Sequence, residues 1–252
     1  MIARGHPLVA GMSVEYRVRF DEAGPDGTAR PSMFVRYAQD CAWRHSQALG
    51  FGRAWYDARG MAWLVRAIRL EQLAPAPTGS ALTVSTAISG FRRVIARRHT
   101  TVAMADGRPI AVVDTDWVMT DQRGMPTRIP DDFPSLFPEV PPPFEPFRVS
   151  LPPSPEAAAV STTTVRRSDL DAMGHANNGA YVDWADEAVA GLAGIHPRPA
   201  ALPRSLTVEY VAPARPGAAM AGSAWALPSG SVAYRLGEGD QELVRVIVEP
   251  IA

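Results

Sequence analysis

The feature that most constrains the fold of this chain is a proline-rich stretch near its middle, from Asp131 to Pro155. Proline lacks the backbone N–H and fixes φ, so neither a helix interior nor a central strand tolerates such a run. We therefore expect a semi-rigid linker over residues 131–158, flanked by domains over residues 1–130 and 159–252. Four phenylalanines are expected to pin this linker to a neighbouring surface: Phe133, Phe137, Phe144 and Phe147.

The two segments on either side of the linker resemble each other. Residues 71–79 read EQLAPAPTG and residues 209–217 read EYVAPARPG, so a strand-like run ends in a Pro/Gly turn in both. Upstream of each, from Tyr16 and from Thr162, a short strand, an acidic glycine-containing loop and a helix follow in the same order. The repetition of both segments in one order predicts an internal duplication.

Each repeat is predicted to combine one long helix with several strands. From about Met33 to Leu49, apolar side chains recur every three or four residues, which predicts a helix with one buried face. This stripe contains Phe34, Tyr37, Ala38, Cys41, Ala42 and His45. Residues 61–70, 81–90, 93–105 and 109–120 are β-rich and separated by turn signals, which predicts an antiparallel sheet. The predicted fold class is α+β.

Composition narrows the classes of function. With a formal net charge of -1 and a pI of about 6.5, the chain has no basic field to draw it onto nucleic acid or an anionic membrane. A run of roughly 18 apolar residues is absent, so no membrane span is expected, and the apolar N-terminal stretch is too short for a secretory signal. Cys41, the single cysteine, is expected to be buried and fits a reducing compartment. We expect a cytoplasmic protein.

The most informative motif spans residues 166–187 and reads RRSDLDAMGHANNGAYVDWADE. Acidic residues, Gly174 and His175 precede an amphipathic helix, whose unpaired N-terminal N–H groups can polarise a carbonyl. Gly174 would let a substrate approach the backbone. Asp171 could activate water or attack the carbonyl, while His175 orients it or carries protons. On spacing alone, a helix-capping acid, a turn glycine and an ordinary histidine explain the motif equally well.

The segment SDLDAMGHANN, with Tyr181 and Trp184 after it, resembles the hotdog thioesterase superfamily and the acyl-acyl-carrier-protein (acyl-ACP) thioesterases in particular. Four first-half segments resemble that family in the same order: GPDG at 24–27, QDCAWRH at 39–45, WLVR from Trp63 and DTDWVMTDQRGMPTRIPDDF from Asp114. The resemblance implies two tandem hotdog domains, each an antiparallel sheet wrapped around a long central helix. It also implies that they pair as an intramolecular pseudo-dimer with the active centre at their mutual face. Further homo-oligomerisation stays open.

The same resemblance implies the site residues. Asp171 and His175 match the acid and histidine of the family, with no cofactor and no metal. Met173 stands where plant-type members carry asparagine, and the acidic and cysteine positions after the next strand align with Pro213 and Ala214. Because a thioether cannot replace an amide, polar support must come from other side chains.

The candidates for that support lie in both halves. They are Asn178 as a further catalytic residue, Asn177 and Glu187 in the same half, and Gln39, Asp40 and His45 on the first helix. Each has a structural alternative, because Asn178 could cap the helix, Glu187 could be solvated, and Gln39 and Asp40 could lie on the outer helix face.

The resemblance predicts hydrolysis of an acyl thioester, carried by ACP, to free acid and thiol. Bulky residues, namely Phe34, Tyr37, Trp43, Met61 and Trp63, could line an apolar tunnel for the acyl chain or belong to the ordinary core. Arg92, Arg93, Arg97 and Arg98 could attract an acidic carrier protein or form a solvated strand edge. An acyl-CoA thioesterase, a hotdog dehydratase or hydratase, and a non-catalytic acyl-binding protein remain alternatives.

Overall fold

The computed structural model describes residues 10–137, 144–192 and 201–251, and its strands in these ranges form one sheet. The first half supplies β1 (Met12–Arg17), β2 (Met61–Gln72), β3 (Ala81–Phe91), β4 (Ile95–Met104) and β5 (Pro109–Asp121). The second half supplies β6 (Ala159–Thr164), β7 (Arg204–Tyr210), β8 (Ala219–Ala226), β9 (Val232–Glu238) and β10 (Gln241–Pro250). Neighbouring strands run antiparallel in the order β1-β3-β4-β5-β2-β7-β10-β9-β8-β6.

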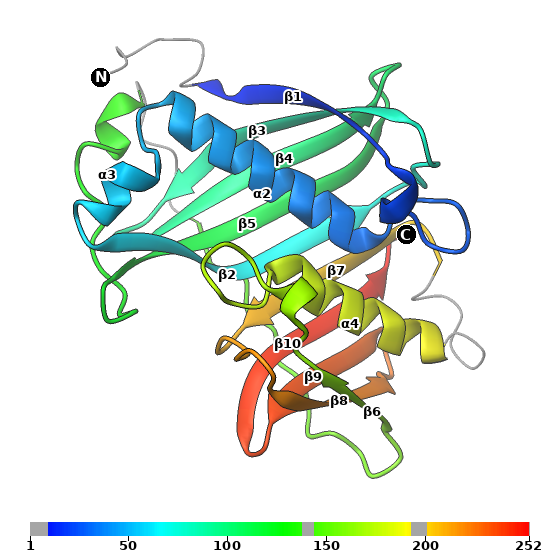
Figure 1. Cartoon of the computed structure of the whole chain (residues 1–252). Coiled ribbons are helices and arrows are strands. Elements are labelled where there is room, and N and C mark those ends of the chain that lie inside the picture. Colours follow the sequence, from blue (N-terminus) through cyan, green and yellow to red (C-terminus); the bar gives the residue numbers. More distant parts are fainter. Residues whose placement is uncertain (1–9, 138–143, 193–200, 252) are drawn as a thin grey trace.

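Two long helices lie on the same face of this sheet (Figure 1). The helices are α2 (Pro31–Ala48), α3 (Arg53–Asp57) and α4 (Asn178–Leu192), with short 3-10 turns η1 (Phe20–Glu22), η2 (Pro134–Leu136) and η3 (Arg167–Asp169). The predicted first helix corresponds to α2, which begins slightly earlier because Pro31 is favourable at the first helical position. All six residues of the predicted apolar stripe are buried, so that prediction is confirmed. The four predicted first-half strands correspond to β2–β5.

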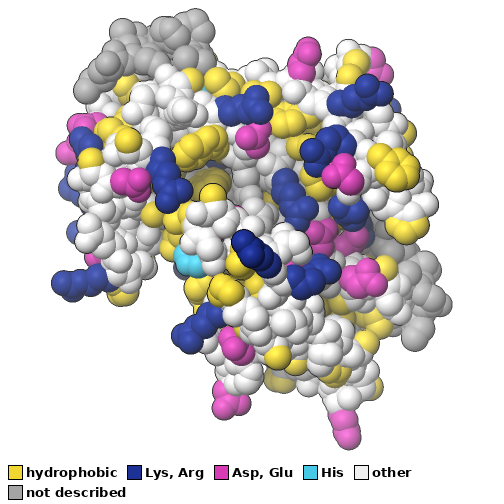
Figure 2. Space-filling model, viewed as in Figure 1, with side chains coloured by type: hydrophobic (Ala, Val, Ile, Leu, Met, Phe, Trp, Pro, Cys, Tyr) yellow, Lys and Arg dark blue, Asp and Glu magenta, His cyan; other side chains and the backbone are white. Residues whose placement is uncertain are grey.

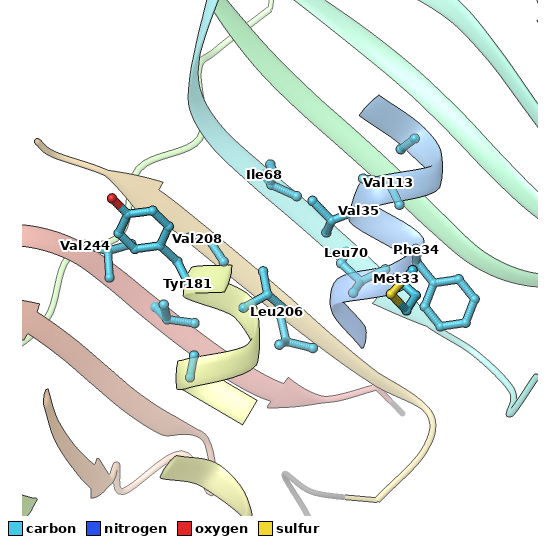
Figure 3. Packing of buried hydrophobic residues seen from close by; sticks show 14 of the residues in the cluster. Met33, Phe34, Val35, Ile68, Leu70, Val113, Tyr181, Leu206, Val208 and Val244 are labelled. Carbon is cyan, nitrogen blue, oxygen red and sulfur yellow. The ribbon is translucent and has the colours of Figure 1, made fainter. Parts of the chain in front are cut away.

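The two halves of the sheet are joined by β2 and β7, which pair from Ala67 with Glu209 to Gln72 with Arg204. This pairing places α2 and α4 in contact with each other over the seam. Figure 3 shows Ile68 and Leu70 of β2 near Leu206 and Val208 of β7, in one hydrophobic core that continues across the seam.

The repeated Pro/Gly turns occupy equivalent positions in the two halves. Gly79 and Gly217 have φ values of +85° and +76°, a left-handed conformation that favours glycine. The N–H of Gly79 donates to the carbonyl of Val18 at 2.8 Å, and the N–H of Gly217 donates to the carbonyl of Val165 at 3.0 Å. The two half-sheets also share one strand order, read outward from the seam.

The four phenylalanines of the predicted linker all contact the first half. Phe133 and Phe137 are buried in a hydrophobic cluster under β2–β5. Phe144 and Phe147 lie against the guanidinium of Arg97, at 4.3 and 3.8 Å from the ring centroids. The prediction that these rings pin the segment to a surface is confirmed, although residues 138–143 lie outside the described ranges.

Two buried carboxylates of the sheet hold the second part of the linker. Asp116 accepts a hydrogen bond from the N–H of Phe147 at 2.8 Å, and Glu209 accepts one from the N–H of Val149 at 2.9 Å. Glu209 also pairs with Arg66 and Arg148, at 2.7 and 3.0 Å. The charge of Glu209 therefore ties together the central seam and the linker.

We predict that Glu209→Ala lowers the free energy of unfolding by about 2 kcal/mol, because it removes a buried carboxylate that pairs with partly exposed arginines and accepts a hydrogen bond from the N–H of Val149. Glu145→Ala is the matched control, since Glu145 is 93% exposed and pairs only at the surface with Arg92. Its expected effect is below about 0.5 kcal/mol. Urea unfolding of both variants checks this, and equal effects of the two substitutions would contradict it.

Candidate active site

The loop that precedes α4 is closed by its own backbone. The N–H of Asp171 donates to the carbonyl of His175 at 2.8 Å, and Leu170 forms a β-bridge with Ala176. Gly174 has a φ of +77°, and a Cβ added there would meet nothing within 4 Å. Glycine is therefore favoured at this position by the backbone conformation and not by crowding.

The carboxylate of Asp171 is fixed by this loop through one of its oxygens. Oδ1 accepts hydrogen bonds from the N–H groups of Met173 and His175, at 2.8 and 3.3 Å. Oδ2 accepts no hydrogen bond from the described residues. The charge of Asp171 also contributes to raising the pKa of Tyr181 in α4, although burial is the larger cause. One carboxylate oxygen is thus held in place and the other is left for a ligand or water.

Two cavities meet at this loop. The first has a volume of about 720 Å³ and enters the first half, between α2 and the sheet. The second has a volume of about 1020 Å³ and follows β2 and β5 toward β7. Five residues line both cavities: Gln39, Trp63, Trp117, Asp171 and Met173. Figure 2 shows the surface hollowed between the two halves, with hydrophobic side chains inside the hollow and basic side chains around it.

The first cavity is largely apolar. Its large side chains are Trp43, Tyr56, Met61, Trp63, Trp117 and Phe133. Trp43, Met61 and Trp63 were predicted tunnel residues. Phe34 and Tyr37 instead belong to the ordinary core, the other alternative, and the Tyr37 hydroxyl donates to Glu22 at 2.5 Å.

Several predicted site residues come together here. His175 and Asn178 line the second cavity with Asp171, and Gln39 reaches both cavities from α2. The imidazole of His175 is exposed, and its link to Asp171 runs through the backbone. The side chain of Asn178 makes no hydrogen bond with the described residues, so it remains open to a ligand.

Other predicted residues have structural partners. Asn177 is the helix cap, because its Oδ1 accepts from the N–H of Gly179 at 2.8 Å. The capping role proposed as the alternative for Asn178 thus belongs to its neighbour. Asp40 accepts from the Tyr16 hydroxyl at 2.5 Å and pairs with Arg44 at 2.8 Å, so its carboxylate is engaged.

His45 and Glu187 lie away from the loop. His45 is fully buried, and its Nδ1 lies 2.8 Å from Nη1 of Arg98, which places the imidazole in the interior of the first half. It lines neither cavity. Glu187 is exposed on α4 and also lines neither, as its structural alternative implied.

Two buried donors at the shared wall have no acceptor. They are Nε2 of Gln39 and the indole Nε1 of Trp117, neither of which has a hydrogen-bond partner among the described residues. Buried donors are normally satisfied, so a pair without acceptors beside a cavity indicates a place for a polar ligand. Trp117 was missed in the sequence, where alternation along β5 gives only the face on which it lies.

The predicted arginine patch does not form as a unit. Arg97 makes two hydrogen bonds to Asp116, at 2.7 and 2.8 Å, on the face that carries the linker. Arg98 points to the opposite face and is buried beneath α2, because successive strand residues alternate. Arg92 and Arg93 line the second cavity. The strand-edge alternative is also wrong, since β4 lies between β3 and β5.

The first half contains the same loop without its acid. Residues Ala23 and Ala29 form the bridge that Leu170 and Ala176 form in the second half. By this correspondence Gly24 takes the place of Asp171, and Thr28 that of His175. The described chain therefore has the acid and histidine in one of its two loops.

Over residues 10–137, 144–192 and 201–251, no three His, Cys, Asp or Glu side chains converge as metal ligands would. None of the helices there is long and apolar enough to cross a membrane.

Solved structures that share this architecture include three whose names describe them as thioesterases. A Lactobacillus plantarum protein assigned as an oleoyl thioesterase superposes with a TM-score of 0.84 at 19% identity, over 97% of this chain and 98% of that one. A Bacteroides thetaiotaomicron acyl-ACP thioesterase gives 0.79 at 17% identity, over 95% and 97%. The 12:0-ACP thioesterase of Umbellularia californica gives 0.79 at 21% identity, over 97% of each chain. The predicted α+β hotdog fold is confirmed.

Two family models identify the protein family of the chain. The acyl-ACP thioesterase N-terminal domain matches residues 11–137, and the acyl-ACP thioesterase C-terminal domain matches residues 153–234. No curated protein sequence matches the chain. The chain belongs to the acyl-ACP thioesterase family, and its activity is the hydrolysis of acyl thioesters.

We predict that Gly174→Ala destabilises the protein by about 1 kcal/mol, because alanine is strained in a left-handed conformation. Gly191→Ala is the matched control: this glycine also has open space around it but lies within α4. There alanine should stabilise by about 0.5 kcal/mol through its helix propensity. Thermal unfolding of the two variants measures the difference, and shifts of the same sign would contradict the account of the loop.

Proposed function

We propose that the chain hydrolyses acyl-ACP, with Asp171 as the general base and the acyl group in the first cavity. The observation that carries this proposal is the position of Asp171. It lies where a largely apolar cavity meets a second cavity that is lined by arginines, and one of its carboxylate oxygens has no hydrogen bond. The two cavities match the two parts of an acyl-ACP substrate, which are an apolar acyl chain and an anionic carrier arm.

In the proposed reaction, Asp171 takes a proton from a water molecule as the water oxygen adds to the thioester carbonyl. The tetrahedral intermediate then collapses, the C–S bond breaks, and the proton held by Asp171 passes to the thiolate, which leaves as the thiol. The free carboxylic acid is the other product. His175 is proposed to carry protons to the leaving sulfur, for which its exposed place in the second cavity is suited. If Asp171 instead attacked the thioester carbonyl as a nucleophile, its carboxylate would occupy the same position.

The carbonyl oxygen gains charge in this step and needs hydrogen-bond donors. We propose that Gln39 and Trp117 supply them, because both carry buried N–H groups without acceptors and both line the two cavities beside Asp171. They would replace the amide that Met173 cannot supply. Asn178 is the further polar group on the side of the second cavity.

The second cavity suits the carrier arm. Arg66, Arg92, Arg93 and Arg148 line it. Arg66 and Arg148 are paired with Glu209, and Arg92 with Glu145, whereas Arg93 makes no ion pair with the described residues. Cationic side chains there would attract both the phosphate of a phosphopantetheine arm and an acidic carrier protein. Coenzyme A shares that arm, so acyl-CoA is the alternative substrate.

We also propose the domain organisation given by the sequence, with a linker over residues 131–158 and the halves paired as a pseudo-dimer. The pairing of β2 with β7 and the shared strand order support it.

A reducing, cytoplasmic location is proposed as well. Burial of Cys41 raises the pKa of its thiol to about 11, so the group stays protonated and unreactive there.

We predict that Asp171→Asn lowers kcat at least about a thousandfold and that His175→Ala lowers it about a hundredfold, because base and proton carrier are lost. Asp26→Asn is the matched control: Asp26 is exposed in the equivalent loop of the first half and lines neither cavity. Thiol release from acyl-ACP and from acyl-CoA, with folding checked by circular dichroism, measures all three. A folded wild-type protein inert on every thioester would instead favour an acyl-binding role.

We predict that Gln39→Leu and Trp117→Phe each lower kcat about a hundredfold with a smaller change in KM, because a donor to the developing oxyanion is lost. Gln47→Leu serves as control, since Gln47 is exposed on the same helix and lines neither cavity. Steady-state kinetics on one acyl thioester measures kcat and KM separately. A rise in KM alone would indicate that these donors only bind the ground state.

A further inference from the structure

Arg98 is a buried cation that no carboxylate of the described residues pairs with. Its residue surface is 7% exposed, and its hydrogen-bond partner is the imidazole Nδ1 of His45 at 2.8 Å. Among the described residues no Asp or Glu pairs with it. Arg204, the other arginine that is buried in the described ranges, does have such a partner, because its Nη2 lies 2.7 Å from the carboxylate of Asp186.

Arg98 is one of the residues that line the first cavity. Arg98 lines that cavity together with aromatic side chains, including Tyr56 and Trp117. It shares the inner face of the sheet with Thr115, its direct partner on β5, which is neutral. Burial lowers the pKa of Arg98 to about 10, so the side chain remains charged at neutral pH.

This arrangement is unfavourable for a chain that ends in a methyl group. A hydrocarbon that filled the cavity would displace water from the guanidinium and provide no acceptor in exchange, which costs free energy. His45 cannot neutralise the charge, because a nitrogen that accepts from Arg98 belongs to a neutral imidazole. A carboxylate matches the guanidinium in charge and in its paired oxygens.

We infer that the acyl group hydrolysed by this protein carries a carboxylate at its far end, and that Arg98 binds that carboxylate inside the first cavity. The inference rests on the proposed function, since it uses the same cavity for the acyl group. Gln39 and His45 are six residues apart on α2, so Arg98 is displaced along the helix by roughly 9 Å from the proposed thioester site. The chain between the two ends then runs along the apolar wall.

The wild-type enzyme tests this directly with two thioesters of equal carbon number, octanoyl-CoA and suberoyl-CoA. Suberoyl-CoA differs in having a carboxylate in place of the terminal methyl group. We expect kcat/KM to be at least about tenfold higher for suberoyl-CoA, as for other charge-assisted recognition. An equal or higher value for octanoyl-CoA would overturn the inference while leaving the thioesterase function intact.

Variants assign the preference to Arg98. Arg98→Met should reverse it, by losing suberoyl-CoA turnover and keeping or gaining octanoyl-CoA turnover, and Arg98→Lys should keep part of it. Arg108→Met removes an exposed arginine from the β4–β5 turn that lines neither cavity, and it should leave the ratio unchanged. An unchanged ratio in folded Arg98→Met would overturn the assignment.

A binding measurement separates this inference from catalysis. Free suberate should raise the unfolding temperature of the wild-type protein more than octanoate does, and the difference should vanish in Arg98→Met. If neither thioester is hydrolysed but suberate still stabilises selectively, the proposed function fails and the carboxylate site stands. If turnover occurs and suberate gives no selective shift or preference, the carboxylate site fails alone.

Discussion

The arrangement of this protein depends on the pairing of β2 with β7. Six residue pairs, from Ala67 with Glu209 to Gln72 with Arg204, turn two half-sheets into one. Because the sheet is continuous, α2 and α4 lie side by side on one face, and the loop before α4 meets the wall of the first half. A slip of one residue would turn every β7 side chain to the other face, including the buried carboxylate of Glu209. The position of the site therefore follows from the register of the seam.

The buried carboxylates of the sheet have ion-pair partners, whereas the buried arginine that lines the first cavity has no carboxylate partner among the described residues. Asp116 and Glu209 are satisfied by arginines and by backbone N–H groups of the linker, so they hold the sheet and the linker together. Within the described ranges no carboxylate pairs with Arg98, which contacts the imidazole of His45, and the buried donors of Gln39 and Trp117 have no acceptor. Since unsatisfied polar groups weaken a fold, their gathering along one cavity is best explained by a ligand that completes them.

The two similar halves contribute unlike parts to the candidate site. The second half supplies the loop with Asp171 and His175, while the equivalent loop of the first half has Gly24 and Thr28. The first half supplies most of the wall of the first cavity, together with the donors of Gln39 and Trp117 that have no acceptor among the described residues. Neither half alone holds both the acid and the space for an acyl group.

The sequence by itself determined the elements that depend on local spacing. These are the apolar stripe of α2, the four strands that follow it, the repeated Pro/Gly turns, and the loop before α4 that contains Asp171 and Gly174. Family resemblance added the hotdog fold and the reaction. Tertiary structure decided which residues come together. Gln39 and Trp117 line the same cavities as Asp171, Asn177 rather than Asn178 caps α4, and Arg98 contacts His45 of α2. The physical reason is that alternation along a strand fixes which residues share a face, whereas what covers that face is set by packing between elements distant in sequence.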